Sequence, residues 1–116
     1  RINARKRVTL MREARYRAEA EVFHALAHPV RLQLLDFLAE GPHCACEIEP
    51  EFSRDQSTIS RHLIALKRAG LVQARREGVR VIYHLSDARI QKARELIRDF
   101  IADRAREHAA VLAQGG

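Results

Sequence analysis

The chain has 116 residues, a formal net charge of +6, 47% apolar residues and two cysteines. This length and apolar content predict one globular domain with a hydrophobic core. The positive charge favours an anionic partner, either nucleic acid or a membrane surface. No apolar run approaches the length of a membrane span, which argues against a transmembrane protein.

The cysteine spacing and the N-terminal sequence indicate in which cellular compartment the protein is expected. A single residue separates Cys44 from Cys46, and this spacing is poor for a structural disulfide, so a secreted disulfide scaffold is not expected. No signal peptide precedes the first predicted helix. We therefore expect a cytoplasmic protein with no membrane partner.

The N-terminal third begins with a basic segment. Residues 1–9 are weakly patterned, and we expect an N-terminal arm that is either solvated or in contact with nucleic-acid phosphates. Residues 10–116 are expected to form the domain. Its first helix, over 10–27, carries an alanine-rich stripe on which another helix can approach closely.

Pro29 ends the first helix and suits the first turn of a second helix over 30–40. The side chains of this second helix expected to face inward are Val30, Leu34, Leu35 and Leu38. Residues 43–51 predict one more short helix, and residues 52–55 predict a turn into the segment that follows.

Residues 56–71 predict an amphipathic helix. Ile59, Leu63 and Leu66 recur with the spacing i, i+4, i+7 and make one apolar stripe. Asp55 stands just before the helix as an N-cap. An ordinary surface helix would show the same stripe, so the polar residues beside it decide the interpretation.

Short polar and basic side chains occupy the rest of this helix, as in a helix that reads a DNA groove. Gln and Ser can reach base edges, and Arg can bind guanine or phosphate. The residues predicted to contact DNA from this helix are Gln56, Ser57, Thr58, Ser60, Arg61, His62 and Lys67.

A change of period after the helix predicts a β-hairpin. Residues 72–75 are extended, 76–78 form a turn, and residues 79–85 alternate as in a strand. The apolar residues of this strand are expected to share one face, which is made of Val79, Val81, Tyr83 and Leu85. Arg76 and Arg80 lie near the tip, which predicts a DNA-binding wing, although a solvated charged turn would share this pattern.

A last helix opens at Ser86 and is predicted to extend to about Ala113. It is too long for a small domain to bury, so together with the first helix it is expected to form a two-fold dimer interface. The predicted fold is mainly α with a β-hairpin wing, a dimeric winged helix-turn-helix. No catalytic triad, phosphate loop or carboxylate pair is evident, so an enzyme is not expected.

The chain resembles the ArsR/SmtB metal-sensing repressors. The resemblance is carried by ALAHPVRLQLL at 25–35, the CAC triplet at 44–46, QSTISRHLIALKRAGLV at 56–72 and GVRVIYHL at 78–85. It covers roughly residues 25–110. It implies a dimeric winged helix-turn-helix repressor that an inducer releases from double-stranded operator DNA, with no cofactor needed for DNA binding.

The cysteine pair is similar to the thiolate site of family members that sense arsenic, antimony, cadmium or lead. A third cysteine of the arsenic sensors is replaced here by Glu49. Two thiolates suit a soft, trigonal ion, so As(III) or Sb(III) is the favoured inducer, and methylated trivalent arsenic fits for the same reason. Glu49 or His43 is the candidate third ligand.

Cadmium, lead and zinc are the other inducers considered. Zinc prefers four ligands, which would require nearby histidines or carboxylates in addition to the cysteines. A second zinc site of the family, on the last helix, starts Asp-x-His. This chain reads Asp87-Ala88-Arg89 at that point and has Phe100 where a later His is expected, so we expect that site to be missing.

Helical geometry suggests how the cysteine site would act. Two residues separated by one position point about 200° apart on a helix, so binding one ion through both cysteines is expected to unwind the first turn of the short helix. The competing interpretations are two buried structural cysteines, and a repressor whose cysteine pair is a redox or sulfur-species switch.

Overall fold

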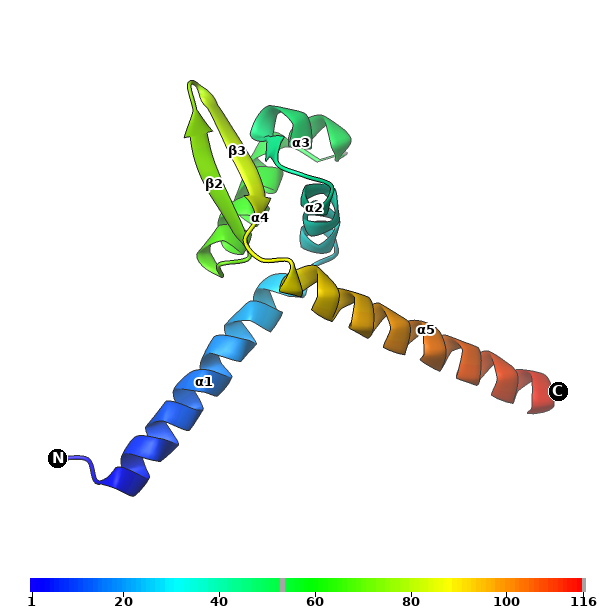
Figure 1. Cartoon of the computed structure of the whole chain (residues 1–116). Coiled ribbons are helices and arrows are strands. Elements are labelled where there is room, and N and C mark those ends of the chain that lie inside the picture. Colours follow the sequence, from blue (N-terminus) through cyan, green and yellow to red (C-terminus); the bar gives the residue numbers. More distant parts are fainter. Residues whose placement is uncertain (53, 116) are drawn as a thin grey trace. The chain divides into compact units, whose positions relative to one another are not determined.

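The computed structural model describes residues 1–52 and 54–115. The chain forms two compact units, Arg1–Ser86 and Asp87–Gly116, and each is considered by itself. The first unit holds four helices and a three-stranded sheet, and the second holds one helix. Figure 1 shows the element order along the chain. No helix in the described ranges is long and apolar enough to cross a membrane.

Helix α1 spans Ala4–Leu26 and begins earlier than predicted. The Asn3 side chain accepts a hydrogen bond from the Lys6 backbone N–H at 2.8 Å, which caps the helix. Most of the segment expected to be an unpatterned arm is therefore helical. Only Ala25 of α1 is buried, and the C-terminal end of the helix packs on helices α2 and α4.

Helix α2 spans Pro29–Ala39 and confirms the predicted core positions. Its four predicted inward side chains are all buried: Val30, Leu34, Leu35 and Leu38. His28 precedes the helix, and its Nδ1 accepts a hydrogen bond from the Val30 N–H at 3.2 Å. Proline at the first helical position costs no hydrogen bond, because that N–H has no partner within a helix.

Residues 43–51 do not form a single helix. His43–Cys44 is a short strand, β1, and helix α3 spans Ala45–Glu51. Cys44 has an extended backbone (φ −64°, ψ 144°) and is the N-cap of α3. The prediction placed both cysteines inside one helix, and this was wrong because a two-residue strand has no period for the sequence to reveal.

Helix α4 spans Gln56–Arg68, and its predicted stripe of Ile59, Leu63 and Leu66 is buried. The Asp55 carboxylate accepts the Thr58 N–H at 2.7 Å, which confirms the predicted cap. The helix ends sooner than expected. Gly70 has φ +79° there, a conformation that favours glycine. Residue 53, within the predicted turn before α4, lies outside the described residues.

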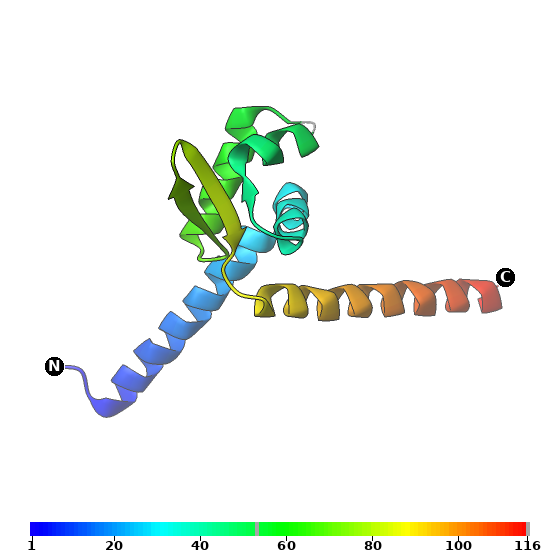
Figure 2. The ribbon, with the colours of Figure 1, turned by 45° about the horizontal axis from the view of Figure 1, so that its top comes forward.

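Strands β2 (Val72–Glu77) and β3 (Arg80–Leu85) form the predicted hairpin. The sheet has a third strand, because β1 pairs antiparallel with the opposite edge of β3. Both views show the hairpin beside α4 (Figures 1 and 2). The buried side chain of β3 is Ile82, at 7% exposure, whereas Val79 is 99% exposed at the turn. The predicted apolar face was therefore the wrong one.

Helix α5 spans Arg89–Gly115. It begins after Ser86, the predicted start, because the Asp87 carboxylate accepts the Arg89 N–H at 2.8 Å and pairs with the Arg89 guanidinium at 2.7 Å. These bonds, led by the side-chain bond from Arg89, lower the pKa of Asp87 to about 2. An ionised carboxylate before the first turn suits the positive end of the helix.

Candidate nucleic-acid interface and cysteine site

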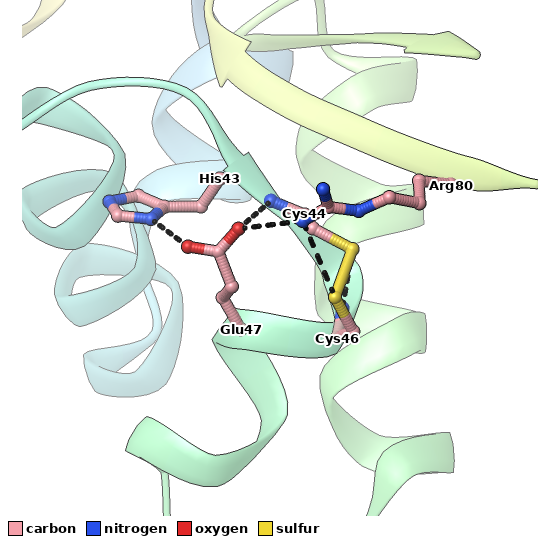
Figure 3. Close-up of a disulfide and its surroundings, with 5 residues drawn as sticks. All are labelled: His43, Cys44, Cys46, Glu47 and Arg80. Carbon is pink, nitrogen blue, oxygen red and sulfur yellow. Dashed lines mark hydrogen bonds and ion pairs between the residues drawn. A yellow bond between two sulfur atoms is a disulfide. The ribbon is translucent and has the colours of Figure 1, made fainter. Parts of the chain in front are cut away.

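The two cysteines meet at the junction of β1 and α3. Cys44 and Cys46 form a disulfide, with Cα atoms 5.1 Å apart, although one intervening residue was expected to disfavour it. The pairing is feasible because Cys44 lies outside the helix and is free of the 100° rotation between helical residues. Cys44 is buried at 3% exposure, whereas Cys46 is exposed. Figure 3 shows the pair.

The first turn of α3 is capped by both cysteines and Glu47. The Cys44 sulfur accepts the Cys46 N–H at 3.1 Å, and Glu47 Oε1 accepts the Cys44 N–H at 3.3 Å. This reciprocal arrangement is a capping box. Glu47 also bonds His43 through its other oxygen at 3.1 Å. The bond from His43, followed by the one from the Cys44 N–H, lowers the pKa of Glu47.

Arg80 links the wing to the cysteine site. Its guanidinium lies 3.2 Å from Glu47 Oε1 and 3.9 Å from the Cys46 sulfur (Figure 3). Arg80 begins β3, the strand to which β1 is paired, with Cys44 opposite Ile82. A residue predicted to contact DNA therefore touches the predicted sensor site, a proximity that spacing along the chain could not reveal.

A hollow of about 460 Å³ lies beside the cysteines, between α3, the start of α4 and the wing. Of the two candidate third ligands, Glu49 lines this hollow. His43 instead turns Nδ1 to Glu47 and stacks on Phe37 with ring centroids 4.1 Å apart. Among the described residues, no group of three or more His, Cys, Asp or Glu side chains is arranged to hold a metal ion.

The polar residues of α4 divide into two groups. Gln56 and Ser60 are exposed and line the same hollow as the cysteines. Ser57 bonds the capping carboxylate of Asp55 at 3.1 Å. The residues of the predicted DNA-reading set that are exposed on α4 are Gln56, Ser57, Ser60, Arg61 and Lys67, and Thr58 and His62 are half-buried.

His62 is half-buried and contacts α2 and the residue that caps it. Its Nδ1 accepts a hydrogen bond from Arg31 Nε at 3.1 Å, and its ring lies 4.3 Å from that of His28. Arg31 also bonds the Ala25 carbonyl at 3.3 Å, so it joins the end of α1, α2 and α4. Sequence analysis missed Arg31, because its partner is thirty-one positions away in the chain.

The two arginines predicted to lie near the tip of the wing do so. Arg76 and Arg80 are exposed and lie at the hairpin end, where Glu77 pairs with Arg80 in register and Arg76 pairs with Val81. Arg75 is paired with Glu77 at 3.0 Å. Arg61 and Lys67 of α4 are exposed as well, and exposed cations are the side chains that bind a phosphate backbone.

Comparisons with known proteins identify relatives over most of the chain. Residues 28–74 match the family model described as bacterial regulatory protein, arsR family. An HTH-type transcriptional regulator of Methanocaldococcus jannaschii is 43% identical over 84 residues, covering 72% of this chain and 94% of that protein. A protein of Streptomyces lividans described as a probable mercury resistance operon repressor is 37% identical, covering 74% and 69%.

Solved structures give the same fold. The homodimeric winged helix-turn-helix DNA-binding domain of a Mycobacterium bovis protein matches with a TM-score of 0.71 and 37% identity, covering 78% of this chain and 83% of that one. A protein described as a possible transcriptional regulator for arsenical resistance matches with a TM-score of 0.57 and 30% identity, covering 69% of this chain and 82% of that one. This chain, a winged helix-turn-helix protein, therefore belongs to the arsR family of regulatory proteins, which are DNA-binding transcriptional regulators and not enzymes.

Proposed function

We propose that this protein is a homodimeric repressor that leaves its operator when trivalent arsenic or antimony binds Cys44 and Cys46 in their reduced form. One observation carries the proposal. The two sulfurs meet at the start of α3 and line one hollow with Gln56 and Ser60 of α4. A ligand held by both sulfurs therefore lies against the helix that reads DNA.

The donor set suits a soft ion that needs few protein ligands. Sulfurs close enough to form a disulfide can also bind one trigonal ion, with the third position filled by Glu49, solvent or a small thiol. A closed zinc site needs four ligands, and no suitable cluster of His, Cys, Asp or Glu occurs in residues 1–52 and 54–115. Cadmium and lead remain weaker candidates. The relative described as a probable mercury resistance operon repressor and the neighbour described as a possible regulator for arsenical resistance support a soft, thiophilic inducer in general.

DNA binding in this proposal uses two copies of the chain. The Mycobacterium bovis neighbour is homodimeric, and a dimer places two reading helices on half-sites about 34 Å apart. Helix α4 enters the major groove, and Arg76 and Arg80 of the wing contact phosphate or the minor groove. No cofactor is required for this step, because the cationic side chains supply the attraction.

Release follows from the position of the cysteines on two elements. Cys44 belongs to β1, which is paired with the wing strand β3, and Cys46 belongs to α3. When the two reduced thiols displace two hydroxyls of As(OH)₃ or Sb(OH)₃, two waters are released, and the resulting ion-bridged pair alters the junction between these elements. The first turn of α3 need not unwind, in contrast to the expectation from sequence. A coupling of about 1–3 kcal/mol would lower DNA affinity 5–150-fold.

A redox or sulfur-species switch is the second candidate, and the disulfide itself favours it. Oxidation of two thiols to a disulfide removes two protons and two electrons, which an oxidant such as peroxide accepts. In that case the oxidised and reduced proteins would differ in DNA affinity without any metal. Both candidates use the same two sulfurs and the same junction.

Operator release under inert atmosphere separates the two candidates. Fully reduced protein bound to operator DNA is challenged with arsenite, antimonite, cadmium, lead, zinc and peroxide in parallel, and the bound fraction is followed by fluorescence anisotropy. Release by arsenite or antimonite at micromolar concentration supports the metalloid sensor. Release by peroxide alone would replace it with the redox switch.

A further inference from the structure

The large apolar side chains that are exposed within residues 1–52 and 54–115 are unevenly distributed. Most lie on α1 and α5, the helices expected to form the dimer interface, and Ile2 lies just before α1. The two others are Ile64, in the third turn of α4, and Val79, at the turn of the wing. Both of these side chains therefore stand on the elements that are proposed to contact DNA.

We propose that Ile64 is a specificity-determining residue of α4, and that its side chain contacts the 5-methyl group of a thymine in the major groove. This inference rests on the proposed function, in which α4 lies in that groove. Thymine carries a methyl group on its major-groove edge, and apolar side chains recognise this base by contact with it. The α4 residues predicted from the sequence to contact DNA are polar or basic, and Ile64 adds an apolar contact to them.

Ile64 lies on the face of α4 that points away from the core. Residues i and i+7 of a helix lie about 20° apart around its axis, so Ile64 shares a face with Ser57, and both are exposed. Leu66 lies about 180° from Ser57 on the same scale and is fully buried. The Ile64 side chain, at 43% exposure, is therefore available to a partner outside the domain.

The side chain of Ile64 covers the turn before it, because side chains on an α-helix point back towards the N-terminus. That turn holds Ser60 and Arg61, which are exposed and predicted to contact DNA. Arg61 Nε donates a hydrogen bond to the Ser57 carbonyl at 3.3 Å, which holds the Arg61 side chain along the helix. Ile64 therefore adjoins the part of α4 that carries the base-reading side chains.

The branched side chain of Ile64 suits a contact with a methyl group. Branching at Cβ leaves one strongly preferred rotamer in a helix, so little side-chain freedom is lost when the contact forms. The contact removes apolar surface of the side chain and of the base from water. Burial of one methyl-sized group corresponds to about a fourfold gain in affinity.

The test replaces thymine by uracil, which keeps the base pair and the minor-groove edge but lacks the methyl group. Duplexes that the wild-type protein prefers are first selected from a library of random sequence. Each thymine of a selected duplex is then replaced by deoxyuridine, and the affinities of wild type and Ile64→Ala are measured by fluorescence anisotropy. At one thymine position of a half-site, uracil should weaken wild-type binding about fourfold and leave the binding of Ile64→Ala unchanged.

Val79→Ala is the matched control, because it also shortens an exposed apolar side chain on an element proposed to contact DNA. The wing is proposed to contact phosphate or the minor groove, where thymine presents no methyl group. Val79→Ala should therefore remain as sensitive to uracil as wild type. Ile64→Ala should keep the thermal stability and the dimer mass of wild type, since the position is exposed and alanine favours a helix.

The outcomes separate this inference from the function on which it rests. If uracil weakened wild type and Ile64→Ala equally at every thymine, or weakened neither, the role of Ile64 would be overturned and operator binding would stand. A monomeric Ile64→Ala protein would overturn it too, and would assign the side chain to the interface between copies. Failure of the wild-type protein to select any duplex sequence would remove the proposed function together with this inference.

Discussion

The two cysteines occupy different environments, and this difference shapes what their substitution should do. Cys44 is buried and accepts the Cys46 N–H as the N-cap of α3, whereas Cys46 is exposed. Serine is a better N-cap than cysteine, which offsets the cost of burying a hydroxyl at Cys44. Neither cysteine reads DNA in the proposed function, so stability and DNA binding can be separated from inducer response.

Cys44→Ser and Cys46→Ser should each give a constitutive repressor. We expect operator affinity close to wild type, a free energy of unfolding within about 1 kcal/mol of the reduced wild type, and no release by arsenite or antimonite. One remaining thiolate cannot hold a soft ion against competing thiols. Anisotropy titrations and thermal unfolding measure these quantities. If Cys46→Ser still left DNA at micromolar arsenite, the ligand set would have to be sought at Glu49 and the histidines.

His62 should make the stability of the fold depend on pH. Burial, followed by the charges of His28 and of Arg31, Arg54 and Arg61, lowers the pKa of His62 below its ordinary value of 6.5. The unfolded chain therefore binds more protons than the folded one as the pH drops below 6.5. The stabilising contribution is present above that pH and is lost as the pH falls through the folded-state pKa.

His62→Gln retains an acceptor for Arg31 but does not titrate, so the free energy of unfolding should fall less between pH 7 and pH 5 than in wild type. Urea unfolding at each pH measures the difference, with His108→Gln on the exposed surface of α5 as the control. An unchanged pH dependence in His62→Gln would mean that another group carries the effect.

At the scale of elements, periodic segments were predictable and short or tertiary features were not. The aliphatic spacing of 30–38 and 59–66 identified the faces of α2 and α4 that are buried. Strand β1 has only two residues, and its partner is β3, far along the chain. That pairing buries Ile82 and joins Cys44 to the wing. The sequence therefore allowed the cysteine pair and the hairpin to be identified separately. It could not reveal that the two are in contact.

The wing and α4 should affect DNA binding in different ways. Arg76→Ala and Arg80→Ala should each weaken binding to all duplexes alike and lower the salt dependence by about one unit, since each removes one phosphate contact. Gln56→Ala should relax sequence preference with little change in salt dependence, which makes it the matched comparison. These effects are read from affinities for operator and unrelated DNA across a salt series.

Arg80 has an additional role to separate from DNA contact, because it also pairs with Glu47. Within residues 1–52 and 54–115, it is Arg80 and not Arg76 that contacts Glu47 and Cys46, so the two arginines should differ in inducer response. If Arg80→Ala altered sequence preference and left the salt slope unchanged, the assignment of wing and reading helix would have to be reversed.

For the whole molecule, α1 and α5 carry large apolar side chains that neither helix buries by itself. The exposed residues of this kind on the two helices include Met11, Tyr16, Phe23, Leu96, Ile97, Phe100 and Ile101. On α5 they recur at positions 96–97 and 100–101, which places them along one side of the helix. Monomeric proteins rarely leave such stripes uncovered, and a second copy of the chain is the partner that fits the proposed operator binding.

We therefore expect light scattering to give twice the chain mass of 13.3 kDa at micromolar concentration, and a double variant Ile97→Glu/Phe100→Glu to give a monomer. The variant should lose about 100-fold or more in operator affinity, because two linked half-site contacts become one. The cysteine site lies wholly within Arg1–Ser86, so the monomer should still bind arsenite with wild-type affinity. A monomeric wild type would contradict the dimer, whereas a monomeric variant that no longer bound arsenite would show that sensing itself depends on the second copy.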